Sequence, residues 1–146
     1  MFWRRTIYSC TILALLASSS HTLAAEPTLK EIMQALRDDL VQVLDGLLLD
    51  DPARIAIAAQ RIADHPEVSV NDRQRVTAEL QEEMAQFAGF DHQVHSLAVS
   101  IEAAARAEDL ALVRAETRQL IDGCLACHSM YKNRIADVLS EARPEN

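Results

Sequence analysis

The sequence predicts an all-α protein, built as an antiparallel four-helix bundle with an additional short helix between the second and third helices of the bundle. Residues that favour helices, chiefly Ala, Leu, Glu, Gln and Arg, dominate the 146 residues, and no stretch keeps the period-2 alternation of a strand. Apolar residues instead recur at intervals of three and four in the main segments. The connections between these segments are short, which favours antiparallel neighbours.

Residues 1–25 have the pattern of a secretory signal peptide. Arg4 and Arg5 precede a short apolar run, and small residues follow it up to Ala25. The run is shorter than the roughly 20 residues that a membrane-spanning helix needs. We therefore expect the signal to be cleaved, the protein to be periplasmic, and residues 26–146 to form a single domain with no membrane span.

The first helix is predicted to begin after Thr28 and to end near Asp50. Thr28 and Glu31 match the capping-box pattern, in which each residue satisfies a backbone N–H group of the other. One face of this helix is apolar, and its members are Leu29, Ile32, Met33, Leu36, Leu40, Leu44 and Leu47.

The second helix is predicted to follow Asp51 as its cap, with Pro52 at its first position, and to end before Pro66. His65 precedes this proline in a loop, so we expect it to face solvent. A shorter helix is predicted over residues 72–90, loosening near Gly89. A strongly helical segment follows over residues 91–109.

The last helix is predicted to begin after Asp109, which serves as its cap. Its inward positions recur at threes and fours and are Val113, Thr117, Ile121, Cys124, His128, Tyr131, Ile135 and Val138. Alanine fills many inward positions of the bundle, and the aromatic residues after position 25 are Phe87, Phe90 and Tyr131. Such a core leaves room for something flat and apolar.

Cys124, Cys127 and His128 form a Cys-x-x-Cys-His pattern, which is typical of c-type haem attachment. Positions three apart lie on one side of a helix, so the two thiols can each add to one vinyl group of a haem. His128 lies one turn after Cys124 and can reach the iron as its proximal ligand. Covalent attachment takes place outside the cytoplasm, which fits the signal peptide.

Two other hypotheses compete with haem. A thioredoxin-like redox pair needs a helix N-terminus after a strand, whereas these cysteines lie about four turns into a helix. A haem-free helical module with zinc needs a fourth ligand, and the sequence has no second close pair of Cys or of Cys with His. His92 and His95 could contribute, but nothing in the sequence places them near the motif.

With this motif near its C-terminus, the chain resembles the class II cytochromes c, the family that includes cytochrome c′ and its low-spin relatives. The resemblance covers essentially all of the chain after residue 25. The stretch "CHSMYKNRI" is similar to the family's pattern of an aromatic and a basic residue after the histidine, here Tyr131 and Lys132. The resemblance implies a four-helix bundle that carries one haem c on its last helix.

The sixth ligand of the iron decides the function. The run from Met33 to Leu40 resembles the first helix of Met/His-ligated four-helix cytochromes, and the start of that helix lies beside the later part of the last helix in an antiparallel bundle. Met33 is therefore the candidate distal ligand, with Leu36 and Tyr131 packing against the haem. An apolar residue in that place would leave the iron five-coordinate, as in a cytochrome c′-like protein that binds NO or CO.

The sequence shows no acid–base pair or nucleophile arranged around a substrate pocket, so we expect an electron carrier rather than an enzyme. Cleavage of residues 1–25 removes two of the 14 Lys and Arg and none of the 22 Asp and Glu, so the formal charge falls from −8 to −10. This charge argues against nucleic acid and favours redox partner proteins with a basic docking patch. The resemblance also permits a homodimer.

Overall fold

The computed structural model describes residues 26–140, and its regular secondary structure is entirely helical. The predicted signal peptide (1–25) and the last six residues (141–146) lie outside the described part. The elements are α1 (Leu29–Leu48), α2 (Pro52–Ala63), α3 (Val70–Leu80), the 3-10 turn η1 (Gln81–Glu83), α4 (Met84–Arg106) and α5 (Leu110–Ser140). The all-α prediction is confirmed. Within residues 26–140, every helix is too short or too polar to cross a membrane.

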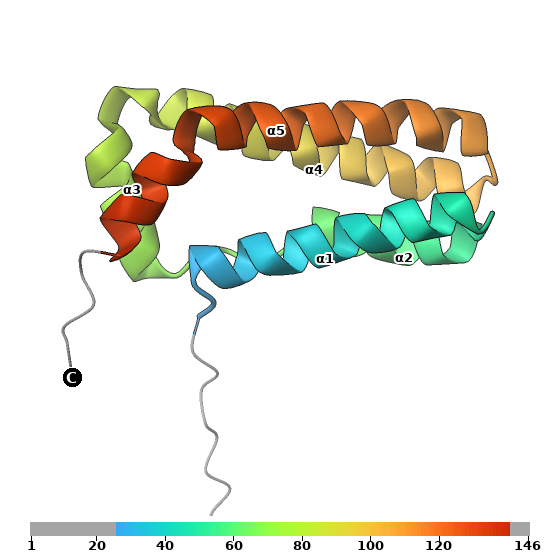
Figure 1. The fold of residues 1–146 in the computed structure, drawn as a ribbon, viewed down its shortest axis with the longest axis horizontal. Helices are drawn as coiled ribbons and strands as arrows, with labels where there is room; N and C mark the ends of the chain where they lie inside the picture. Colours follow the sequence, from blue (N-terminus) through green and yellow to red (C-terminus); the bar gives the residue numbers. More distant parts are fainter. Residues whose placement is uncertain (1–25, 141–146) are drawn as a thin grey trace, which may run out of the picture.

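The helices pack as a chain of neighbouring pairs: α1 on α2, α2 on α4, and α4 on α5. Figure 1 shows α1 and α2 in one layer, α4 and α5 in the other, and α3 at one end. α1 and α5 contact each other over a short stretch only, whereas α3 packs on the late part of α5. There the guanidinium of Arg75 donates to the carbonyl oxygens of Val138 and Leu139.

Three predicted helix caps are confirmed. The Thr28 hydroxyl accepts the Glu31 N–H at 3.3 Å, and the Glu31 carboxylate accepts the Thr28 N–H at 2.8 Å. Asp51 and Asp109 each accept the N–H of the third residue of the helix that follows, at 3.0 Å in both cases. Each cap satisfies a backbone donor that has no partner inside its helix.

The break between α3 and α4 lies at Gln81, so the prediction that the helix loosens near Gly89 is wrong. α3 begins earlier than predicted, behind Ser69, whose hydroxyl accepts the Asp72 N–H at 3.3 Å. Gln81 has φ of 43° and ψ of −109°, a positive-φ conformation outside the helical region, and it ends the helix. Gly89 lies inside α4, where a glycine costs only about 1 kcal/mol relative to alanine and need not interrupt the helix.

The buried apolar side chains form two clusters. The first cluster is aliphatic and rich in alanine, and it joins α1, α2, α4 and the early part of α5. The second cluster joins the start of α1, α3 and the late part of α5, and its buried members are Leu29, Val76, Leu80, Tyr131 and Ile135. Cys124 packs against the first cluster and Cys127 against the second. The boundary between the two clusters therefore falls within one turn of α5.

Candidate haem-binding site

The three residues of the motif lie on one side of α5, about four turns after the helix begins. Cys124 and Cys127 are half-buried and both are free thiols. His128 is exposed, so the prediction that it points into the core is wrong. The buried face of α5 is centred nearer to Leu120, Gly123 and the cysteines. His128 lies at the edge of this face, where its imidazole is accessible to a ligand.

The environment of both cysteines disfavours the thiolate form. Burial raises the pKa of Cys124. Burial also raises the pKa of Cys127, and the nearby Cys124 and the carboxylate of Asp91 raise it further. A thioredoxin-like pair requires the opposite shift, a pKa lowered by a helix N-terminus or a neighbouring cation. The position and the electrostatics of this pair therefore argue against that hypothesis.

Met33 does not lie on the buried face of α1 as predicted, because its side chain is 38% exposed. The face that α1 buries includes Ile32, Val43 and Gly46. Met33 belongs instead to a neighbouring apolar strip at helical spacing, which also includes Leu36, Leu40, Leu44 and Leu47. Met33 and Leu44 in this strip remain more than one-third exposed. Met33 and Leu44 are thus the members of the strip that the described residues leave incompletely packed, whereas Leu36, Leu40 and Leu47 pack against the first cluster.

Leu36 and Cys124 both pack against the first cluster. Met33 is not among the side chains that pack on that cluster. Of the two α1 residues predicted to face the haem, Leu36 is therefore the one that shares a cluster with a cysteine of the motif.

Tyr131 is almost fully buried and held by α4. Its ring meets Phe87 edge-on with the centroids 5.5 Å apart, and Phe90 at 6.2 Å. Its hydroxyl donates to the side-chain oxygen of Gln86 at 3.2 Å. Cys127 packs against the same second cluster. This aromatic group therefore fixes the late part of α5 against α4 on one side of the cysteines.

His65 and Asp91 form a pair that the sequence did not reveal. The Nε2 of His65 lies 3.3 Å from a carboxylate oxygen of Asp91, and its Nδ1 lies 3.0 Å from the Pro66 carbonyl oxygen. Both ring nitrogens face acceptors, and the hydrogen bond to Asp91 is the main cause that raises the pKa of His65. The prediction that His65 faces solvent is wrong, since its side chain is only 20% exposed. His95 donates from Nδ1 to the Ala63 carbonyl oxygen nearby, at 3.0 Å.

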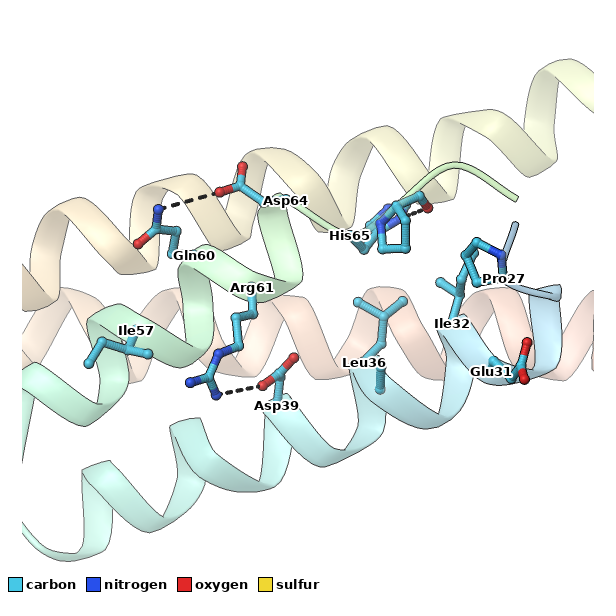
Figure 2. Close-up of a pocket in the computed structure, with 12 residues that line it drawn as sticks. Pro27, Glu31, Ile32, Leu36, Asp39, Ile57, Gln60, Arg61, Asp64 and His65 are labelled. Atoms are coloured by element: carbon cyan, nitrogen blue, oxygen red, sulfur yellow. Dashed lines mark hydrogen bonds and ion pairs between the residues drawn. The ribbon is translucent and has the colours of Figure 1, made fainter. Parts of the chain in front are cut away.

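A groove with a volume of about 680 Å³ opens between α1 and α2. Figure 2 shows Ile32 and Leu36 of α1 on one side of it and Arg61 of α2 on the other, joined to Asp39 across the groove. His65 lies at its rim. The groove includes Leu36, but it contains none of Met33, the cysteines or His128.

The described part of the chain contains no set of side chains arranged to bind zinc. Among residues 26–140, no three or more His, Cys, Asp or Glu side chains are grouped so that they could hold a metal ion. A haem iron needs only one or two protein ligands, so the haem hypothesis does not depend on such a group.

The residues present fit a covalently bound haem. Two protonated thiols lie a turn apart on one side of a helix, and the imidazole that follows them is accessible. The apolar strip on α1 offers exposed Met and Leu side chains without a full set of neighbours.

Comparison of the chain with models of protein families, with curated proteins and with solved structures gave no match.

Proposed function

We propose that this protein is an exported, periplasmic c-type cytochrome of the class II kind, which transfers one electron at a time between redox partner proteins. In this proposal α1, α2, α4 and α5 form an antiparallel four-helix bundle, and α3 is the additional helix. The observation that supports it best is the Cys124, Cys127 and His128 motif at the boundary between the two core clusters.

Each residue of the motif has a separate role in the proposal. The S–H groups of Cys124 and Cys127 add across the two vinyl groups, and the resulting thioether bonds fix the cofactor to α5. The imidazole of His128 binds the iron on the proximal side. The bound haem supplies a one-electron change at its iron.

Met33 is the proposed distal ligand. Its side chain is accessible on α1, and a thioether ligand would favour low-spin iron and electron transfer. The α1 strip would then pack against the ring through Leu36, and Tyr131 would support the ring from the side of the second cluster.

A five-coordinate, gas-binding cytochrome c′-like protein is the second candidate, and one observation favours it. Leu36, rather than Met33, shares the first cluster with Cys124. If Leu36 covers the iron, the distal side is apolar and open to a small gas such as NO or CO.

A visible spectrum of the purified, reduced protein separates these candidates. Sharp, split bands identify low-spin iron with Met33 bound, whereas a broad high-spin band with CO binding identifies the five-coordinate form. We expect Met33→Ala to convert a low-spin spectrum to a high-spin one that binds CO.

Met130→Ala is the matched control for this experiment. Met130 is also exposed, at 47%, but it lies two residues after His128 and so points away from the imidazole. We expect its spectrum to equal that of the wild type. A Met33→Ala spectrum that is also unchanged would remove Met33 from the coordination sphere, and a protein without haem absorption would reject the proposed function.

A further inference from the structure

The end of the molecule opposite α3 exposes large apolar side chains. The α1–α2 turn and the α4–α5 turn both lie at this end in Figure 1. Leu47 of α1 and Leu110 of α5, which lie next to these turns, both pack against the first cluster. Leu48 is 82% exposed and Leu49 is 64% exposed, and Leu112 follows at 41%. We call the surface formed by these three leucines and the two turns the turn end.

The leucines of the turn end are held in place by hydrogen bonds of the backbone. The N–H of Leu49 donates to the Asp45 carbonyl at 3.0 Å, and the N–H of Asp51 donates to the Gly46 carbonyl at 2.8 Å. The exposure of Leu48 and Leu49 is therefore a property of a defined turn. Exposed apolar side chains that adjoin one another, rather than lying singly, are the ones that mark interaction surfaces.

The turn end is also acidic, and two of its acidic residues occupy strained positions. Asp50 has φ of 50° and Glu108 has φ of 57°, at positions just after α1 and α4 where glycine is the usual residue. Asp109 lies beside Glu108 and is also exposed. Within residues 26–140, these three carboxylates take part in no ion pair, whereas Arg54 lies between Asp45 and Asp51. Asp50 and Glu108 thus place carboxylates at turn positions that glycine usually occupies.

We propose that the turn end is the docking surface for a protein partner whose own contact is apolar and ringed by Lys or Arg side chains. Exposed leucines supply the apolar contact, and the surrounding carboxylates complement the basic ring. A second copy of this chain fits poorly as the partner. Two turn ends that face each other would bring like-charged carboxylates together, and these repel.

This docking surface differs from a redox contact at the proposed haem site. Leu112 precedes Cys124 by twelve residues of α5, which corresponds to about 18 Å along the helix. A partner bound at the turn end would contact the end of the molecule remote from Cys124 and Cys127, and His128 would stay accessible. The proposal does not depend on whether the protein binds haem.

The test measures binding of a defined probe to the full mature protein. The probe is a fluorescent synthetic helical peptide with leucines on one face and lysines around them, and binding is followed by fluorescence anisotropy at low and high salt. We expect binding that weakens as salt rises. We expect Leu48→Ser with Leu49→Ser to weaken it by about tenfold or more.

Two sets of variants make the test specific. Asp50→Asn with Glu108→Asn removes two charges but keeps side chains that tolerate the left-handed conformation, so we expect weaker binding at low salt and no change at high salt. Ile57→Ser with Val99→Ser removes two apolar side chains of 50% and 46% exposure elsewhere, and we expect unchanged binding. Circular dichroism checks that every variant folds.

Three results would overturn the proposal. The wild type fails to bind the peptide, or the leucine pair and the Ile57 and Val99 pair weaken binding equally. Alternatively, sedimentation shows a wild-type dimer that the Leu48 and Leu49 variant dissociates, in which case a second copy occupies the turn end.

Discussion

The two core clusters differ in how completely they are packed. In the first cluster Ile55, Ile101 and Val113 are fully buried, and alanines bring α2 and α4 close together. The second cluster has fewer buried members, and aromatic rings on α4 supply much of its packing. Cys124 and Cys127 join the two. The first cluster thus stabilises the fold by close aliphatic packing, and the Cys124, Cys127 and His128 motif lies where that packing ends.

The largest expected effect is in the first cluster. Ile101→Ala should lower the free energy of unfolding by about 2–5 kcal/mol, because it leaves a cavity among fully buried neighbours. Val99→Ala, two residues earlier on the same helix and 46% exposed, should change it by less than about 0.5 kcal/mol. Guanidinium unfolding measures both. Equal losses would mean that the first cluster is not the packed region described here.

Gly46 tests the close approach of α1 and α2 at the edge of the first cluster. A Cβ at Gly46 would lie 2.6 Å from Cγ1 of Ile55 and 3.1 Å from the Asp51 carbonyl oxygen, so Gly46→Ala should cost about 1–3 kcal/mol of unfolding free energy. Gly89→Ala meets nothing within 4 Å and should instead stabilise α4 by about 0.5–1 kcal/mol. Thermal melts of the two variants should shift in opposite directions, and shifts of the same sign would contradict the packing.

A smaller effect is expected in the second cluster. Tyr131→Phe keeps the contacts with Phe87 and Phe90 but removes the hydrogen bond to Gln86, so it should cost about 0.5–1.5 kcal/mol of unfolding free energy. A double-mutant cycle with Gln86→Ala isolates this bond. Additive losses in the cycle would show that the hydroxyl and the amide do not interact.

The smallest expected effect concerns His65 and Asp91, the pair that joins the α2–α3 connection to α4. Asp91 raises the pKa of His65 above its ordinary 6.5, so this stabilisation is complete below about pH 6.5 and is lost as the pH rises through the folded pKa. His65 lowers the pKa of Asp91 below 3.8, so the stabilisation is also lost in strong acid. Because Asp91 is 59% exposed, we expect less than about 1 kcal/mol.

Unfolding free energies measured near pH 6 and near pH 9 test this pair. The wild type should lose the contribution of the pair between the two conditions, and His65→Gln should remove that part of the pH dependence. His92→Gln, at an exposed histidine close to Asp91, is the control and should retain it. The same pH dependence in wild type and His65→Gln would exclude the pair as its cause.

The local features of the fold could be predicted from the sequence. Thr28, Asp51 and Asp109 cap their helices because a cap depends only on the side chain and the next three residues. Helical periodicity likewise predicted the all-α class. Gln81 could not be found in this way, because glycine and asparagine are the residues that signal a helix end with a positive φ.

The candidate site was predicted in part. The motif on α5 follows from spacing alone, but the exposure of His128 and Met33 depends on how far each lies from the centre of its buried face. Periodicity locates that centre only to within about one residue, which corresponds to about 100° around a helix. The pairing of His65 with Asp91 joins residues far apart in the sequence, and no local pattern indicates it.

The most direct test of the central claim is the mass and colour of the mature protein after denaturation. The full chain, including residues 1–25 as the predicted signal, should be expressed with a maturation system for c-type cytochromes, then purified and unfolded. The proposed function predicts one haem that stays on the chain and a mass greater than that of the polypeptide by one haem, with both lost in Cys124→Ser with Cys127→Ser. A colourless protein with the mass of the bare polypeptide would contradict it.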